Sequence, residues 1–368
     1  MENVIGIISA NYASKGLGTL TDERTIASLP FGGRYRMIDF PLSNMVRAGI
    51  NTVGVITPYK YRSIIDHIGS GKEWRLDRKN GGLYILPGSV FGIANPDSRF
   101  LLRDIDRNSI YLMRSPADHV LITSANTVCN TDYQDFIIAH ISSGADLTMM
   151  CKTCDITNPY MSTVTLKNGK VASVTPGVKA GDTEFIDCFI ISRLLLLKIL
   201  EWYKAVNYLD LFEILNGAFD KMDARVYQCS GYSECIMDVQ SYYDTSMQLL
   251  IPSVRDVIFN REQPILTKVQ DDVPTEYLVG ASVQSSLVPS GCKISGAVRN
   301  SILFSNVRVE EGAVVENSII MKGCVIGKNC TVRNAIIDRN NAIPAGTILR
   351  GPENAPYIMG KNMHHYGT

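Results

Sequence analysis

Short, β-rich repeats fill the last part of the chain, from about residue 280 onward. Ile320, Ile326 and Val332 keep a step of six residues, with glycines at the corners of such units. This step is typical of a hexapeptide β-helix, in which each coil buries its apolar face against the next. The pattern predicts a parallel β-helix over residues 280–368. The sequence carries no histidine between Ser282 and Met363, which favours a packing and oligomerisation domain over acyl transfer or metal binding.

A different pattern precedes the repeats. Strand-like runs such as 53–57 and 119–123 alternate with helical stretches such as 136–141. This alternation argues for a mostly parallel sheet with helices on its faces. We predict a Rossmann-like α/β domain over residues 1–250. Prolines and acidic residues then gather over residues 251–279, which predicts a linker.

The composition sets outer bounds on the function. Thirty-six basic residues balance thirty-six acidic ones, so no overall charge draws the chain to nucleic acid or to a membrane surface. Because no apolar run approaches bilayer-spanning length and the N-terminus lacks a basic signal region, we expect a cytoplasmic location. Nine scattered cysteines favour reduced, buried thiols. Cys151 and Cys154 are the closest pair, and no second pair follows at zinc spacing.

The first turn of the α/β domain carries unusual residues for its place. Residues 4–8 (VIGII) have the composition of a buried parallel strand. In nucleotide-binding α/β domains, the turn after this strand offers glycine amides to phosphate. Here Asn11 and Tyr12 bring side chains to that turn. The phosphate cradle is therefore poorly built, although the scaffold is that of a nucleotide-binding domain.

Several segments together resemble ADP-glucose pyrophosphorylase, also called glucose-1-phosphate adenylyltransferase. They are residues 31–44 (FGGRYRMIDFPLSN), 300–304 (NSILF), 312–315 (GAVV), 318–321 (SIIM) and 335–338 (AIID). The resemblance runs nearly end to end and keeps the family's domain order. It implies a nucleotidyltransferase domain followed by a left-handed parallel β-helix. It also implies a reaction in which ATP and glucose 1-phosphate give ADP-glucose and pyrophosphate, with Mg²⁺ and cationic clamps.

The family's nucleotide-binding positions are changed in this chain. The family's loop reads Leu-Ala-Gly-Gly-x-Gly-x-Arg-Leu, whereas residues 9–17 read SANYASKGL. Asn11 and Tyr12 stand at two of the glycines, and Gly16 stands at the arginine. Asn126 replaces a metal-binding aspartate, and a neutral amide holds Mg²⁺ poorly. The resemblance therefore implies a degenerate active site.

Two further family positions support the same interpretation. Thr175 stands where a lysine meets the sugar phosphate, and Asp238 matches a second metal-binding aspartate, which would be vestigial. Losing several transition-state contacts together should reduce catalysis to near background. The resemblance thus implies a GlgD-type subunit, a non-catalytic partner of a catalytic ADP-glucose pyrophosphorylase chain in bacterial glycogen biosynthesis. Mg²⁺ would enter such a complex through the catalytic partner. A compensating group could still come from Lys15, Arg103 or Asp104.

The resemblance also implies an effector site. Anionic activators of the family, typically sugar phosphates, bind between the two domains at basic residues. Arg24 and Arg36 match two of those positions, while Glu23 and Pro30 replace a lysine and a histidine. Arginine pairs readily with phosphate, so a partial effector site is expected; a solvated or helix-pairing role is the alternative. Two other functions stay open: an independently active adenylyltransferase with rebuilt contacts, and a sugar-phosphate or nucleotide sensor.

Overall fold

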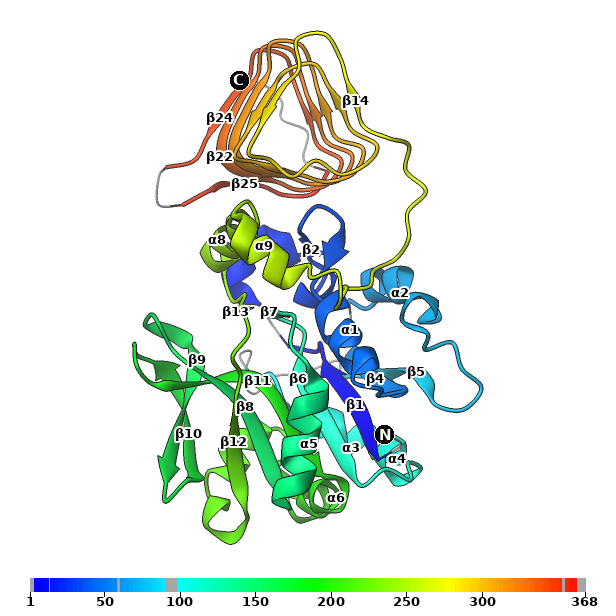
Figure 1. The fold of residues 1–368 in the computed structure, drawn as a ribbon, viewed down its shortest axis with the longest axis vertical. Coiled ribbons are helices and arrows are strands. Elements are labelled where there is room, and N and C mark those ends of the chain that lie inside the picture. The colour runs from blue at the N-terminus through cyan, green and yellow to red at the C-terminus, as the bar shows by residue number, and fades with distance from the viewer. Residues whose placement is uncertain (1–2, 13, 58–59, 90–97, 353–354, 363–368) are drawn as a thin grey trace.

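The computed structural model describes residues 3–12, 14–57, 60–89, 98–352 and 355–362. Within them, an α/β domain is followed by a coil of short parallel strands (Figure 1). The Rossmann-like α/β class and the parallel β-helix predicted from the sequence are both confirmed.

The α/β domain contains thirteen of the described strands. They are β1 (Val4–Ser9), β2 (Pro30–Phe31), β3 (Tyr35–Arg36), β4 (Thr52–Thr57), β5 (Gly82–Pro87), β6 (His119–Ser124), β7 (Thr127–Cys129), β8 (Leu147–Thr153), β9 (Asn158–Lys167), β10 (Lys170–Val178), β11 (Thr183–Ser192), β12 (Ala224–Gln228) and β13 (Ser233–Cys235). Nine of them form one sheet, in which β5, β4, β1 and β6 lie side by side and parallel. β11 joins β6 antiparallel, and β8 and the β9–β10 hairpin pair with β11.

Helices cover both faces of this sheet, because the side chains of each strand alternate between the faces. Ile5 and Ile7 pack in one core with α3, α4 and α6, whereas Val4 and Ile8 pack in a second core with α1, α2 and α5. Burial on both faces explains the nearly continuous apolar run of β1. The helices are α1 (Asp39–Arg47), α2 (Arg62–Ile68), α3 (Leu102–Arg107), α4 (Ser109–Met113), α5 (Tyr133–Ser143), α6 (Arg193–Trp202) and α7 (Leu211–Leu215).

The C-terminal strands stack in two parallel ladders around a roughly triangular coil (Figure 1). The strands are β14 (Glu276–Tyr277), β15 (Ser282–Gln284), β16 (Lys293–Ile294), β17 (Ala297–Arg299), β18 (Ile302–Leu303), β19 (Arg308–Val309), β20 (Val314–Ile320), β21 (Val325–Ile326), β22 (Thr331–Ile337), β23 (Ala342–Ile343), β24 (Ile348–Arg350) and β25 (Tyr357–Met359). Buried apolar side chains from successive coils fill its centre.

The coil repeat differs from a strict six-residue step. Val298 pairs with Val315, and Val315 with Val332, so these coils advance by 17 residues and have one side a residue shorter than the other two. An earlier coil is shorter still, because Val283 pairs with Val298 and advances by 15 residues. The corners accommodate sides of unequal length because asparagine or glycine occupies them with positive φ, as in the corner column Asn300, Asn317 and Asn334.

The two domains share one hydrophobic core. Helices α8 (Val239–Gln248) and α9 (Pro252–Ile258) pack there with apolar residues of the Phe31 segment and of the first coils, such as Ile302 and Ile319. Tyr243 of α8 also donates a hydrogen bond to the Asn317 carbonyl oxygen at 2.6 Å. The expected linker 251–279 is thus partly helical and packed, and the first coil strand, β14, precedes the expected boundary at residue 280.

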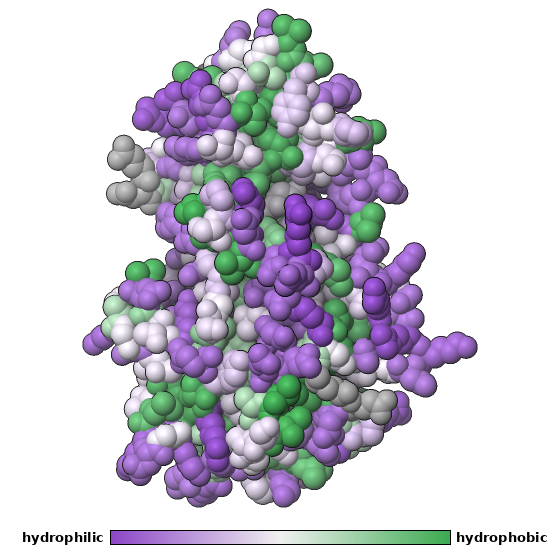
Figure 2. All heavy atoms as spheres, viewed as in Figure 1, coloured by the Kyte–Doolittle hydropathy of each residue, from purple (hydrophilic) through white to green (hydrophobic). Residues whose placement is uncertain are grey.

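The face of the molecule seen in Figure 2 is mostly hydrophilic, with small apolar areas between polar side chains. Among the residues that the structure describes, no helix combines the length and apolarity that crossing a membrane requires.

Candidate functional site

The carboxyl ends of β1, β4 and β6 meet at one edge of the sheet. Ser9, the last residue of β1, pairs with Ile56 on one side and with Ser124 on the other. In open parallel sheets, ligands bind at this edge, outside the ends of the strands. The first turn and Asn126 therefore lie where a nucleotide would be expected.

Asn11 is held by the chain itself. Its amide nitrogen donates to Asp104 Oδ2 at 2.6 Å, and Asp104 Oδ1 accepts the Ser89 backbone N–H at 2.7 Å. A Cβ atom on Gly88 would lie 2.3 Å from the Asn11 amide nitrogen, so the two segments are in close contact. Burial raises the pKa of Asp104 above its ordinary value. Asn11 and Asp104 thus close one side of the turn that follows β1.

Tyr12 closes the other side of the turn. Its hydroxyl oxygen accepts the backbone N–H of Ala125 at 3.1 Å. Burial, with the nearby Asp187 carboxylate, raises the pKa of Tyr12 well above its ordinary value, so the phenol stays neutral. The amide that follows β6 is therefore already satisfied. Ala13 lies outside the described residues.

Gly16 sits in a short 3₁₀ segment, Lys15–Thr21, rather than in an open phosphate loop. A Cβ atom at Gly16 would lie 2.6 Å from the Met237 carbonyl oxygen and 2.8 Å from Asp238 Cβ. The segment is anchored by the buried Leu17 in the interdomain core. Gly16 therefore packs so closely against the residues before α8 that a side chain such as the family's arginine would not fit at this position.

Asn126 faces sulfur atoms. Its amide nitrogen lies 2.9 Å from both Cys235 Sγ and Met237 Sδ, and its amide oxygen accepts a hydrogen bond from the Ser124 hydroxyl. Asp238, instead, caps α8: its Oδ1 accepts the Ser241 N–H and the Ser241 hydroxyl, each at 2.7 Å. Mg²⁺ prefers anionic oxygen ligands, and Asn126 offers only a neutral amide oxygen that already accepts the Ser124 hydroxyl, so the two positions do not form a pair of ligands for the ion.

No group of three or more His, Cys, Asp or Glu side chains within the described ranges is placed to hold a metal ion. Two of the three residues considered as compensating groups have other contacts. Asp104 accepts a hydrogen bond from Asn11, and Arg103 donates from Nε to Asn207 Oδ1 at 3.2 Å, while Lys15 is exposed.

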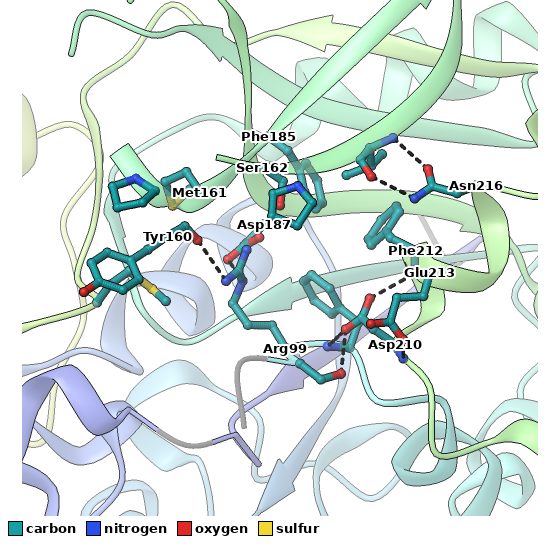
Figure 3. A pocket seen from close by; sticks show the side chains of 16 residues that line it. Arg99, Tyr160, Met161, Ser162, Phe185, Asp187, Asp210, Phe212, Glu213 and Asn216 are labelled. Atoms are coloured by element: carbon teal, nitrogen blue, oxygen red, sulfur yellow. Dashed lines mark hydrogen bonds and ion pairs between the residues drawn. The ribbon is translucent and has the colours of Figure 1, made fainter. Parts of the chain in front are cut away.

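Thr175 lies on β10, opposite Thr163 of β9, and is exposed. Its neighbours Val174 and Pro176 instead line a cavity of about 270 Å³, because successive side chains of a strand point to opposite sides. The cavity lies between the β9–β10 hairpin, β11 and α7, and holds a buried ion pair between Arg99 and Asp187 (Figure 3).

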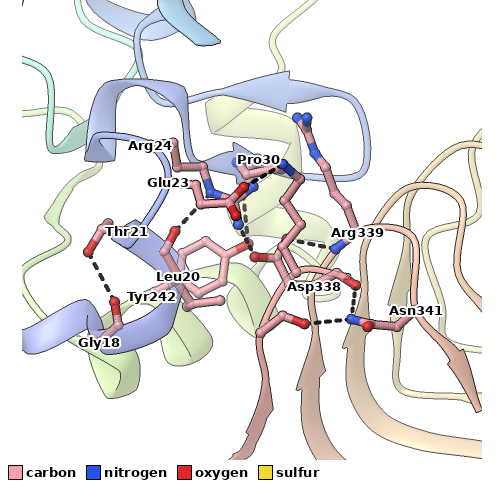
Figure 4. Close-up of polar contacts among 12 residues, drawn as sticks. Gly18, Leu20, Thr21, Glu23, Arg24, Pro30, Tyr242, Asp338, Arg339 and Asn341 are labelled. Atoms are coloured by element: carbon pink, nitrogen blue, oxygen red, sulfur yellow. Dashed lines mark hydrogen bonds and ion pairs between the residues drawn. The ribbon is translucent and has the colours of Figure 1, made fainter. Parts of the chain in front are cut away.

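Arg24 and Arg36 do lie at the domain boundary. Arg24 is 6% exposed and forms an ion pair with the fully buried Asp338 of the β-helix, as Figure 4 shows. Its Nε also donates to the Leu20 carbonyl oxygen at 2.8 Å. Arg36 donates to Ser63 Oγ at 3.0 Å. Burial, with the nearby Arg339, lowers the pKa of Arg36 to about 10.

Arg36 lies among further cations that were not predicted from the sequence. A cavity of about 340 Å³ between the domains is lined by an interdomain cation cluster, which consists of Arg34, Arg36, Lys268, Lys322 and Arg339. Arg339 directly follows the 335–338 motif, so its position in the sequence could have identified it as a candidate. Nothing in the sequence around Lys268 or Lys322 identifies them as candidates. Lys268 and Lys322 donate to neutral oxygens, on Asp66 (backbone) at 2.7 Å and on Gln270 at 2.6 Å.

A sequence model of the nucleotidyl transferase family matches residues 13–161, and one of GlmU-like, C-terminal hexapeptide domains matches residues 273–353. The glycogen biosynthesis protein GlgD of Bacillus subtilis (strain 168) is 33% identical over 360 residues, or 98% of this chain and 96% of that protein. The chain belongs to the GlgD and glucose-1-phosphate adenylyltransferase family.

Other members of the GlgD and glucose-1-phosphate adenylyltransferase family are also similar to this chain over most of its length. GlgD of Geobacillus stearothermophilus is 33% identical over 312 residues, which cover 85% of this chain and 82% of that protein. The glucose-1-phosphate adenylyltransferase of Pseudothermotoga lettingae is 30% identical over 330 residues, 86% of this chain and 77% of that protein. The resemblance found in the sequence is confirmed.

Proposed function

We propose that this chain is a GlgD-type subunit with little or no catalytic activity of its own. It acts in bacterial glycogen biosynthesis by binding a catalytic glucose-1-phosphate adenylyltransferase chain and modulating it. One observation carries the proposal: the chain's own side chains fill the edge of the sheet where a nucleotide would bind. Asn11 binds Asp104, Tyr12 binds the Ala125 amide, and Asn126 faces two sulfur atoms.

The filled edge opposes catalysis in two ways. A phosphate must find free backbone N–H groups or cations, and the amide that follows β6 is taken by Tyr12. Phosphoryl transfer depends on positioning and on metal ions, and Asn126 and Asp238 offer no suitable pair of ligands. The activity of a complex would therefore come from the partner, together with its Mg²⁺.

Association with the partner is tested by mixing the purified chain with a catalytic homologue from the same organism. Analytical ultracentrifugation should show a hetero-oligomer absent from either chain alone. A subunit that modulates its partner must exchange a coupling free energy across the interface, typically about 1–3 kcal/mol, or a 5- to 150-fold change in affinity. Unchanged sedimentation of both chains, with no kinetic effect, would remove the support for this role.

The interdomain cation cluster supports a second part of the proposal, an anionic effector such as a sugar phosphate. Burial and the like charge of Arg24 lower the pKa of Arg339, so a bound anion would relieve repulsion there. Among the described residues, Arg339 Nε is a buried donor without a hydrogen-bond partner. Phosphate groups suit such guanidinium-rich sites. A sensor that binds without turnover would use the same cluster.

The effector site is tested by calorimetric titration of glucose 1-phosphate into the full chain. Lys322→Gln should weaken binding about tenfold, as expected for one lost phosphate contact of about 1.4 kcal/mol. Lys328→Gln is the matched control, because Lys328 is exposed on the same β-helix and pairs with Glu311 at its surface. Equal losses in both variants would argue against a specific site.

A further inference from the structure

His67, near the end of α2, contacts both the interdomain cavity and a buried carboxylate. The side chain is 4% exposed, and its Nε2 lies 2.6 Å from Oδ1 of Asp39, which is fully buried at the start of α1. Histidine is the side chain that ordinarily changes its charge between pH 5 and pH 8. A titratable ring therefore forms part of the wall of a cavity whose cations are arginines and lysines.

The hydrogen bonds of Asp39 determine where His67 gains its second proton. Asp39 Oδ2 accepts the Arg36 backbone N–H at 2.9 Å, and a carboxylate that accepts at both oxygens has no proton to donate. Nε2 of His67 is therefore the donor in the 2.6 Å contact, and it carries a proton in both charge states of the ring. The proton that makes the ring cationic goes on Nδ1.

The charged groups around His67 act on this proton in opposite directions. Asp39 favours the cationic ring, and so does Asp66, the preceding residue of α2, which also lines the cavity. The interdomain cation cluster opposes the proton from the β3 segment, from the β-helix and from the segment between α9 and β14. That last segment passes beside α2 (Figure 1), where Lys268 donates to the Asp66 carbonyl oxygen at 2.7 Å.

The other neighbours of His67 add little to this balance. Trp74 packs edge-on against the ring at 5.9 Å and is uncharged, and its neighbours Lys72 and Glu73 carry opposite charges. The short segment Ile26–Ser28, which contacts α2, has no charged side chain.

His67 also differs from the charged groups that face it in the pH range of its charge change. Burial and the nearby Arg339 lower the pKa of Arg36 only to about 10. Aspartate and lysine side chains ordinarily titrate below pH 6 and above pH 8. Between these two values, His67 is therefore the group that changes the charge of this wall.

From these contacts we propose that anion binding in the interdomain cavity is coupled to protonation of His67. A bound anion offsets the cations that oppose the proton, so the ring gains a proton at Nδ1 as the anion enters. By thermodynamic reciprocity, the proton strengthens anion binding by the same factor. This inference rests on the effector site proposed above and adds its regulation: the site binds an anion more tightly at pH 6 than at pH 8.

The test is calorimetric titration of sulfate into the full-length chain at pH 6, 7 and 8. Sulfate is the probe because its charge is constant over this range, whereas the charge of a phosphate group changes near pH 6. We expect about tenfold tighter binding at pH 6 than at pH 8, as for one unit charge added near an anion at an effective dielectric constant of about 20. Titrations at pH 7 in two buffers of different ionisation enthalpy should show that protons are taken up with sulfate.

His67→Gln keeps an amide donor toward Asp39 but cannot gain a proton. Its sulfate affinity should stay within about twofold from pH 6 to pH 8, and its binding should take up no protons. His140→Gln is the matched control, because His140 lies beside His119 between β6 and α5 and should keep the pH dependence of the unchanged chain.

The outcomes separate this coupling from the effector site itself. Saturable sulfate binding without proton uptake by the unchanged chain would overturn the coupling and leave the effector site standing. The same pH dependence in His67→Gln as in His140→Gln would do so as well. No saturable sulfate binding at any of the three pH values would overturn the cluster as an anion site, and the coupling with it.

Discussion

At the scale of single residues, the two side chains that replace glycines in the first turn form hydrogen bonds within the chain. Asn11 contacts Asp104, which lies 93 positions away, and Tyr12 contacts Ala125, 113 positions away. The sequence alone predicted that phosphate and metal ligands are missing. It could not predict what replaces them, because the new partners come from distant segments that only the fold brings together.

Asn126→Asp should not create adenylyltransferase activity. The new carboxylate would face Cys235 and Met237, and the first turn would stay filled by Asn11 and Tyr12. We expect pyrophosphate release to stay at the background of the unchanged chain. Strong turnover from this one substitution would show that the turn opens for a nucleotide.

Asp338→Asn should destabilise the chain strongly. Arg24 would keep its buried guanidinium without a counter-charge, and breaking a buried ion pair costs about 3–5 kcal/mol. Urea unfolding should show this loss. Glu311→Gln is the control, because the Lys328–Glu311 pair at 3.3 Å is exposed and should contribute less than about 1 kcal/mol. Similar losses in the two variants would contradict a special role for the Arg24–Asp338 pair.

At the scale of elements, strands and helices of the α/β domain were predictable, because β1, β4 and β6 are apolar and buried and the helical stretch 136–141 lies within α5. In the coils that advance by 17 residues, the six-residue step of the β-helix was right on two sides and wrong on the third. The five-residue side cannot be recognised from the sequence, because an asparagine at the corner is compatible with a side of five or of six residues.

The corner column gives an element-scale prediction. Asn300 has a φ of 43°, a left-handed conformation that a β-branched residue rarely adopts. Asn300→Val should lower the free energy of unfolding by about 1–2 kcal/mol, whereas Asn300→Gly should be nearly neutral. Urea unfolding of both variants checks this. An equal loss in both would point to a lost side-chain contact rather than to backbone strain.

A histidine pair between β6 and α5 predicts acid sensitivity. His140 Nε2 lies 3.0 Å from His119 Nδ1, and burial, with the charge of His119, lowers the pKa of His140 to about 4. In the unfolded chain this pKa is about 6.5, so the unfolded state binds more protons between these values. The stability contributed by neutral His140 is therefore complete above about pH 6.5 and is lost as the pH falls toward 4.

His140→Gln should flatten that part of the profile. Between pH 7 and pH 4 the unchanged chain should lose about 3 kcal/mol more than the variant, measured from urea unfolding at each pH. Carboxylates titrate in the same range in both proteins, so the difference between the two curves isolates the histidine. Parallel curves would contradict the prediction.

At the scale of the whole molecule, the shared core and the Arg24–Asp338 pair join the two domains where the interdomain cation cluster lies. The sequence predicted the order of the domains and, of the cations in this cluster, Arg36 alone. It did not predict the cluster, because Lys268 and Lys322 come from the segment expected as a linker and from a coil. An anion bound there would touch both domains at once, which suits the transmission of an effect to a partner subunit.

The most direct test of the central claim is pyrophosphate release from ATP and glucose 1-phosphate with Mg²⁺. It compares this chain alone, a catalytic homologue from the same organism alone, and their mixture. Because the nucleotide edge is filled, we predict background release from this chain and a changed rate or substrate affinity in the mixture. Substantial turnover by this chain alone would contradict the account.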